Sequence, residues 1–219
     1  MGTVRVHYTE ALEELNQDLL SMGILVDESI NKAKTALINY DLGLAEKVVK
    51  DDNKINAMEE EIEAKCTIIL ATEQPVAGDL RHILTVMKIA TQMERIGDHA
   101  VHLAKAVKKI QNEVTVISME DLSKMADIGS IMINDALTAF LKNSEKMARD
   151  TAGKDDEIDD LNRKLMREGI ENMHNNTALI SQGLTMLFVS RDLERIGDYI
   201  TNICESIVYN ATGKNVELN

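Results

Sequence analysis

Apolar residues recur at alternating intervals of three and four positions through two long stretches of the chain, which is the period of an amphipathic helix. The first series is Val86, Ile89, Met93, Ile96, Ala100, Leu103, Val107 and Ile110. The second series is Met186, Val189, Leu193, Ile196, Ile200, Ile203 and Ile207. Such a spacing indicates helices that pack at a small crossing angle along an apolar seam. We therefore expect both stretches to be long helices within a helical bundle.

Breaks in the helical pattern divide the rest of the chain. The pattern predicts long helices at about 10–39, 44–72, 76–111, 118–149, 155–173 and 177–210. Pro75 separates the second from the third, because proline is tolerated only in the first turn of a helix. Gly213 follows the last helix, as is common at a helix end. The β-branched residues 114–117 link the two halves, and as a strand they would have nothing to pair with.

An internal repeat relates the two halves. The segment Met93-Glu94-Arg95-Ile96-Gly97-Asp98 returns as residues 193–198, with leucine in place of methionine. A match at a fixed offset is the sequence signature of a duplicated structural unit. We therefore predict an all-α fold of two tandem three-helix bundles, the first over residues 1–113 and the second over residues 114–219.

Composition and net charge limit the kinds of partner and location that fit this protein. Only 3% of the residues are aromatic, with one proline and no tryptophan, which suits a bundle of helices. A net charge of −13 argues against a nucleic-acid partner and favours a cation or a basic protein surface. No apolar run approaches the ~20 residues of a membrane span, so we expect no membrane insertion. Cys66 and Cys204 form no disulfide framework, which indicates a reducing, cytoplasmic location.

The repeated segment carries a pair of carboxylates with helical spacing. Glu94 and Asp98 are four residues apart, as are Glu194 and Asp198 in the second copy. Such pairs lie on one helix face and repel each other by roughly 0.2–0.5 kcal/mol. At ~100° per residue both pairs point away from the apolar seam, so we expect them at the surface. A repulsive pair that occurs twice in register suggests a cation between the carboxylates.

A second polar pair precedes the first carboxylate pair along the chain. If residues 44–72 and 76–111 form an antiparallel hairpin that turns at Pro75, Asp52 lies level with Asp98 and Asn56 lies level with Glu94. Asn56 offers only a neutral amide oxygen, so this site should be weaker or differently charged than its counterpart.

The second half has the same arrangement. In a hairpin that turns next to residues 175–176, Asp155 lies level with Asp198 and Asp159 lies level with Glu194. Hard or borderline cations prefer several oxygen ligands, and paired carboxylates on rigid helices can supply them to more than one ion. The alternative is a solvated acidic face whose pairs align only because a helix hairpin was duplicated.

Together these motifs resemble the PhoU family of phosphate-signalling proteins. The repeated Glu-Arg-Ile-Gly-Asp segments and the upstream Asp-Asn-Lys-Ile-Asn and Asp-Asp-Glu-Ile-Asp segments carry the resemblance, and residues 74–81 are similar to the family pattern QPxAxDLR. The resemblance covers about residues 10–213. The second turn, at residues 175–177, lacks that pattern, so any partner contact made there need not be duplicated.

The resemblance implies surface multinuclear metal clusters, with iron or zinc favoured and magnesium or manganese as further possibilities. It implies two ligand sets, the first formed by Asp52, Asn56, Glu94 and Asp98, the second by Asp155, Asp159, Glu194 and Asp198. It also implies a negative regulator of phosphate uptake that links a phosphate ABC transporter, through its ATPase, to a sensor histidine kinase. Family members are often dimeric, so a homodimer is expected.

Two histidines, His99 and His102, lie near the first acidic pair, and a third, His174, belongs to a different motif. His102 is four residues after Asp98 and could extend the first ligand set, although its counterpart in the repeat is Asn202. His99 is expected to be solvated. Residues 171–174 read Glu-x-x-His, which is half of a ferritin-like di-iron signature, but no second copy is present.

Motifs typical of enzymes are missing from the sequence. We find no phosphate-binding glycine loop, no zinc-protease motif and no nucleophile elbow, so we expect no catalysis. Two rivals to a metal-binding regulator remain: a helical scaffold that binds partners without metal, and a ferritin-type di-metal oxidase. Gly97 and Gly197 each cost roughly 1 kcal/mol in mid-helix, which a close approach of helices at the sites would explain. Arg95 and Arg195 are expected to pair with the neighbouring carboxylates, with phosphate binding in the presence of metal as the alternative.

Overall fold

The computed structural model describes residues 2–110 and 116–218, and within them all regular structure is helical. The helices are α1 (Gly2–Asn39), α2 (Leu42–Glu73), α3 (Ala77–Val107), α4 (Met119–Leu141), α5 (Glu145–Ala152), α6 (Asp155–Asn175), the 3₁₀ turn η1 (Thr177–Leu179) and α7 (Ile180–Thr212). The predicted all-α fold is therefore confirmed. None of these helices is both long enough and apolar enough to cross a membrane.

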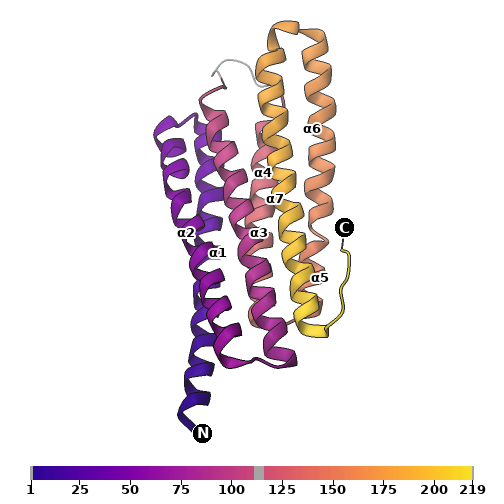
Figure 1. The fold of residues 1–219 in the computed structure, drawn as a ribbon. Coiled ribbons are helices and arrows are strands. Elements are labelled where there is room, and N and C mark those ends of the chain that lie inside the picture. Colours follow the sequence, from indigo (N-terminus) through magenta and orange to yellow (C-terminus); the bar gives the residue numbers. More distant parts are fainter. Residues whose placement is uncertain (1, 111–115, 219) are drawn as a thin grey trace.

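The helices run along the long axis of the molecule and reverse direction from one to the next, except between α5 and α6 (Figure 1). Helices α1, α2 and α3 pack on one another as one bundle, and α4, α5, α6 and α7 form the other, with α5 and α6 following one another in the same direction. The two halves meet along α3 and α7, and α1 also packs on α4. The predicted boundary between residues 113 and 114 lies outside the described residues.

Both predicted apolar seams are buried. Every member of the series on α3 and α7 lies in one hydrophobic core that runs through both halves. Burying one large apolar side chain contributes roughly 1.5–3 kcal/mol, so the seam where α3 packs on α7 is a principal source of stability. The two bundles are consequently one packed body, and α3 and α7 hold the repeated motifs near its centre.

The two predicted hairpin turns are present. Helix α2 ends at Glu73, Gln74 takes a left-handed conformation (φ 47°), and Pro75 lies in the loop before α3. In the second half, the Asn176 side chain accepts a hydrogen bond from the Ala178 backbone N–H at 3.1 Å and so caps the turn that leads into α7. These turns set the register of the α2–α3 and α6–α7 hairpins.

The predicted helix at 118–149 is wrong at its C-terminal end. Helix α4 stops at Leu141, and the following residues form the separate helix α5, which runs back in the opposite direction. Asn143 adopts a left-handed conformation (φ 44°), which ends the helix. Ser144 then caps α5, because its hydroxyl accepts a hydrogen bond from the Met147 backbone N–H at 3.3 Å.

The repeat itself contains the signal for this turn. Between α1 and α2, Tyr40 is left-handed (φ 54°) and the Asp41 side chain accepts a hydrogen bond from the Leu44 backbone N–H at 2.9 Å. Asn143 and Ser144 occupy the corresponding positions in the second half. Helices α5 and α6 together therefore correspond to the single helix α2.

Candidate functional site

The first candidate ligand set lies where α2 faces α3. Asp52 and Asn56 belong to α2, whereas Glu94 and Asp98 belong to α3. Gly97 brings the two helices together: a Cβ at this position would lie 3.2 Å from the Asp52 Oδ1 atom. The carboxylate of Asp52 thus rests against the backbone of α3 at Gly97, one residue from Asp98, the partner that the hairpin register predicts.

Burial and neighbouring negative charge shape the first set. Burial, followed by the charge of Asp98, raises the pKa of Asp52, and Lys105 opposes this only in part. Burial, followed by Asp98, Glu59 and Asp52, likewise raises the pKa of Glu94. The carboxylates therefore repel one another in a partly desolvated place, where a bound cation would relieve the repulsion.

The second candidate set lies where α6 faces α7. Asp155 opens α6 and is only 7% exposed, and the Thr201 hydroxyl donates a hydrogen bond to its Oδ2 atom at 3.2 Å. A Cβ at Gly197 would overlap the Asp155 Oδ1 atom and lie 3.1 Å from Ile158 Cδ1. The glycine is therefore required for the carboxylate to reach this position, which confirms the close approach expected from a mid-helix glycine.

The second set concentrates more negative charge than the first. Burial, followed by the charges of Asp198 and Asp159, raises the pKa of Asp155 to about 7, while the hydrogen bond from Thr201 opposes the shift. Burial and the charge of Asp198 also raise the pKa of Glu194, with Arg195 offsetting part of the effect. All four predicted ligands of this set thus interact electrostatically across the α6–α7 hairpin.

Three oxygen atoms at the two sets are buried and have no hydrogen-bond partner among the described residues. They are Oδ1 of Asp52, Oδ1 of Asn56 and Oδ1 of Asp155. A buried polar atom left unpaired costs about 1–3 kcal/mol, and such atoms in a native fold call for a ligand, an ion or a water. All three are acceptors on predicted ligand residues. The donor set, the glycine cradles and the unpaired oxygens together fit an oxygen-bound cation.

The outer members of the second set have cationic partners. Arg195 donates to the Oδ2 atom of Asp198 at 3.0 Å, so its predicted pairing with a carboxylate is confirmed. Arg163 contacts Oδ2 of Asp159 at 3.3 Å. Arg95 instead lies over the Tyr199 ring, 5.8 Å from its centre. In the described part of the chain, neither acidic set brings three ligand atoms within 4.8 Å of one another.

The acidic groups lie deeper than the prediction of surface groups allowed. Asp98 is exposed, but Glu94, Glu194 and Asp198 are half-buried. Their direction away from the seam of α3 or α7 is compatible with this, because α2 and α6 cover the flanks of those two helices. Both ligand sets thus lie at helix–helix contacts and are partly covered by the neighbouring helix.

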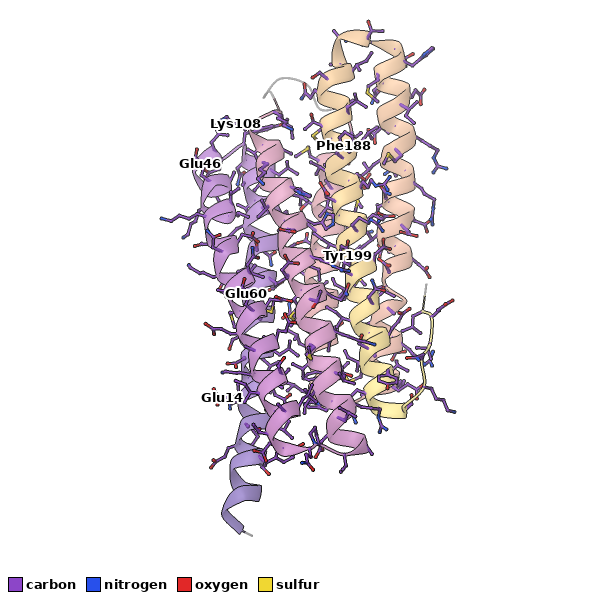
Figure 2. All side chains as sticks on the ribbon, in the orientation of Figure 1. Glu14, Glu46, Glu60, Lys108, Phe188 and Tyr199 are labelled. Carbon is purple, nitrogen blue, oxygen red and sulfur yellow. The ribbon has the colours of Figure 1, made fainter. Side chains whose placement is uncertain are left out.

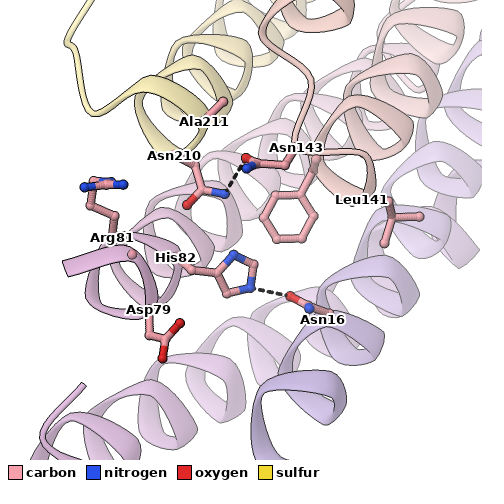
Figure 3. Close-up of a pocket in the computed structure, with 10 residues that line it drawn as sticks. Asn16, Asp79, Arg81, His82, Leu141, Asn143, Asn210 and Ala211 are labelled. Atoms are coloured by element: carbon pink, nitrogen blue, oxygen red, sulfur yellow. Dashed lines mark hydrogen bonds between the residues drawn. The ribbon is translucent and has the colours of Figure 1, made fainter. Parts of the chain in front are cut away.

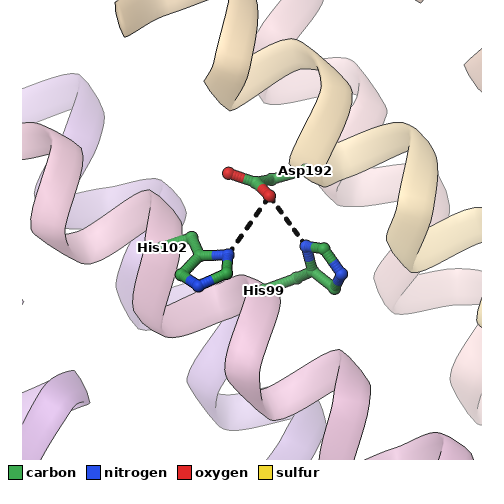
Figure 4. A group of neighbouring side chains, drawn as sticks. All are labelled: His99, His102 and Asp192. Atoms are coloured by element: carbon green, nitrogen blue, oxygen red, sulfur yellow. Dashed lines mark hydrogen bonds and ion pairs between the residues drawn. The ribbon is translucent and has the colours of Figure 1, made fainter.

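The expectations for the histidines need correction. His99 is not solvated, and both His99 and His102 hydrogen-bond to Asp192 of α7 (Figure 4). Sequence reasoning missed Asp192, because the signal required is the pairing of α3 with α7, which hydrophobic periodicity does not provide. Glu171 and His174, the half ferritin motif, are exposed near the end of α6, away from the core that a di-iron oxidase site requires.

A hollow of about 360 Å³ lies at the end of the bundle that holds the α2–α3 turn (Figure 3). His82 bonds to the Asn16 side chain at 2.8 Å and stacks on Phe140, with 5.3 Å between ring centres. Beside it, the Asn210 amide donates to the Asn143 side chain at 2.9 Å. These contacts join α1 and α3 to the second half, so this hollow is a junction between the two bundles.

Comparison with known proteins places the chain in a family. The family model described as the PhoU domain matches residues 19–107 and again residues 122–207. The phosphate-specific transport system accessory protein PhoU homolog of Clostridium acetobutylicum is 39% identical over 209 residues, covering 95% of both chains. The homolog of Streptococcus pneumoniae is 36% identical, covering 99% of this chain and all of its own.

Solved structures agree with the sequence relatives. The crystal structure of the phosphate transport system regulatory protein PhoU from Streptococcus pneumoniae superposes with a TM-score of 0.90 at 35% identity, covering 96% of this chain and all of the other. The crystal structure of PhoU from Pseudomonas aeruginosa gives a TM-score of 0.90 at 34% identity, covering 94% of this chain and all of its own. The chain, with two copies of the domain and relatives over nearly its full length, belongs to the PhoU family of phosphate transport accessory proteins.

Proposed function

We propose that this protein is a metal-binding regulator of phosphate uptake and of phosphate-starvation signalling. It acts in the cytoplasm, without catalysis, by contact with the ATPase of a phosphate ABC transporter, with a sensor histidine kinase, or with both. Its relatives are named as accessory or regulatory proteins of phosphate transport, which supports the regulatory role. In keeping with the family resemblance, the regulation is negative and the protein acts as a homodimer.

One observation carries the metal-binding part of the proposal: buried, unpaired oxygens occur at corresponding positions in both halves. Asp52 and Asp155 each press Oδ1 against a glycine of the neighbouring helix, and neither atom has a hydrogen-bond partner among the described residues. A buried acceptor facing further carboxylates is stabilised by a cation and destabilised without one. A scaffold that never bound metal would be more stable with neutral side chains at these positions.

The residues that would hold the ions are the two sets already described. Asp52, Asn56, Glu94 and Asp98 form the first, and the second consists of Asp155, Asp159, Glu194 and Asp198. The family resemblance favours iron or zinc here, and magnesium and manganese are also compatible with oxygen ligands. Bound ions supply positive charge that offsets the repulsion between the carboxylates.

The chain itself keeps the ligands rigid and sets the surface that partners meet. Gly97 and Gly197 admit the inner carboxylates, and the Thr201 hydroxyl orients that of Asp155. Arg195 and Arg163 lie beside the outer carboxylates of the second set. Occupancy of the two ligand sets therefore changes the local charge at each of them, which gives a partner protein a way to distinguish the loaded state.

Binding to purified partners tests this function. We expect the transporter ATPase or the sensor kinase to bind the metal-loaded protein at least 10-fold more tightly than the variant Glu94→Gln/Asp98→Asn/Glu194→Gln/Asp198→Asn, because the variant lacks carboxylates that hold the ions and so loses their charge. Surface plasmon resonance with and without EDTA measures the difference. A control variant, Glu171→Gln/His174→Gln, alters exposed groups of α6 outside both sets and should bind like the wild type. Equal binding by all three proteins would leave only a metal-independent scaffold.

A further inference from the structure

A cluster of different chemistry lies between α3 and α7, apart from both acidic sets (Figure 4). His99 and His102 are one helical turn apart on α3, and Asp192 approaches them from α7. The Asp192 Oδ1 atom is 2.7 Å from Nδ1 of His99 and 3.3 Å from Nδ1 of His102. One ligand atom from each residue lies within 4.8 Å of the other two, a spacing that no other His, Cys, Asp or Glu trio reaches among the described residues.

We propose that His99, His102 and Asp192 form a zinc-binding site that clamps the two halves of the protein together. Two imidazoles and one carboxylate are ligands that zinc prefers, whereas magnesium and calcium prefer oxygen alone. The site joins a helix of the first bundle to a helix of the second, so the bound ion would cross-link them where they already pack.

The two distances to Asp192 are close to those of a tetrahedral ion. With zinc–ligand bonds of about 2.0–2.1 Å, two ligand atoms of a tetrahedral site lie about 3.3 Å apart. His102 and Asp192 already have this separation, and the shorter His99–Asp192 distance needs only about half an ångström of side-chain movement. The side chains of His99 and Asp192 are 16% and 20% exposed, so packing restrains them near this geometry.

The site is also open to solvent on one side. His102, whose side chain is 53% exposed, and Asp192 both line a groove of about 230 Å³ together with Lys105 and Phe188. Figure 2 labels Phe188 on α7, and Phe188 lines the groove together with Lys105 of α3. The groove gives an ion a path to the ligands and leaves room for a water molecule in the fourth position, the usual arrangement when a protein supplies three zinc ligands.

The site is independent of the first acidic set although Asp98 and His99 are adjacent in sequence. Successive helix residues point about 100° apart. Asp98 interacts with Asp52 of α2, whereas His99 turns to Asp192 of α7. The same helix thus presents oxygen ligands to one neighbour and nitrogen ligands to another.

The repeat offers an internal contrast. The positions that correspond to His99, His102 and Asp192 in the other half are Tyr199, Asn202 and Gln92. Tyr199 packs on His99, with 5.4 Å between the ring centres, and lies where α3 meets α7 (Figure 2). The counterpart trio has neither an imidazole nor a carboxylate, so a single site is expected in each chain.

Cobalt spectroscopy tests the proposal, because Co²⁺ absorbs visible light strongly in tetrahedral nitrogen–oxygen sites and weakly in octahedral oxygen sites. The titration uses the full chain carrying Glu94→Gln/Asp98→Asn/Glu194→Gln/Asp198→Asn, so the acidic sets do not contribute. We expect a strong visible band that saturates and that disappears when zinc is added. The absence of this band would overturn the proposal, whatever becomes of the acidic sites.

Histidine variants on the same background identify the ligands. His102→Gln, at a half-exposed position, should weaken zinc binding at least 10-fold in calorimetry, and His99→Gln/His102→Gln should abolish the cobalt band. His174→Gln changes an exposed histidine of α6 and should leave both unchanged. Circular dichroism verifies that each variant is folded. A folded double-histidine variant that keeps the band would contradict the assignment.

Discussion

Replacing Asp155 by asparagine should stabilise the metal-free protein at about pH 8 by on the order of 2–4 kcal/mol. Asp155 is buried beside Asp198 and Asp159, and together burial and these charges raise its pKa to about 7. A carboxyl whose pKa is higher in the folded than in the unfolded state binds its proton more tightly when folded. Its ionisation therefore opposes folding.

Because the folded-state pKa is the higher one, the stability of the wild type falls over a specific pH range. Below about pH 4 the carboxyl is protonated in both states and contributes nothing. Between about pH 4 and pH 7 the unfolded chain loses the proton first, so the free energy of unfolding falls, and above pH 7 the loss is constant. Asparagine stays neutral and keeps an oxygen that can accept the hydrogen bond from Thr201. The variant should therefore lack this part of the pH dependence.

Urea unfolding in EDTA across this pH range measures the difference between variant and wild type. Asp156→Asn is the matched control, since Asp156 is exposed in the same turn of α6 and should behave like the wild type. With metal present the wild type should be the more stable of the two, because it gains the binding energy of the ion whereas the variant has lost a ligand. Parallel pH profiles of the unfolding free energy for Asp155→Asn and the wild type would show that ionisation of Asp155 does not destabilise the fold.

Replacing Gly197 by alanine should destabilise the protein by about 1–2 kcal/mol, contrary to the usual gain of about 1 kcal/mol for alanine over glycine in mid-helix. The added Cβ would overlap Oδ1 of Asp155 and press on the Ile158 side chain. Asp155 is buried, so its carboxylate has little room to turn aside. The same shift would displace it from the second ligand set.

The matched change in the first half should behave differently. At Gly97 the nearest atoms to an added Cβ, Asp52 Oδ1 and Ile55 Cδ1, are both 3.2 Å away, so a few tenths of an ångström of movement suffice. Gly97→Ala should therefore be close to neutral in thermal unfolding while Gly197→Ala lowers the melting temperature by several degrees. If Gly197→Ala were as stable as the wild type, the close approach of Asp155 to α7 would not be tight.

The register of the two hairpins could be predicted from the sequence. Two antiparallel helices with equal rise keep residues level around a known turn, so Pro75 alone places Asp52 opposite Asp98. The structure has Asp52 against Gly97, one residue away from the predicted partner. Helix periodicity likewise identified the buried seams of α3 and α7.

Contacts between helices that are not neighbours in the sequence could not be predicted in this way. The periodic pattern says which face of a helix is buried but not which helix covers it. The approach of Asp192 to His99 depends on the packing of α7 on α3, which no local signal encodes. The burial of Asp155 also depends on how closely α7 approaches the start of α6, which a glycine permits but does not by itself specify.

The most direct test of metal binding at the acidic sets is elemental analysis of protein purified without a metal-affinity tag. The wild type is compared with Glu94→Gln/Asp98→Asn/Glu194→Gln/Asp198→Asn. We expect the wild type to carry iron or zinc, and the variant to lose more than one ion per chain, because the chain has two ligand sets and the variant removes two ligands from each. A wild type that is metal-free and cannot be reloaded with iron, zinc, manganese or magnesium, or a variant with the same metal content, would contradict the account.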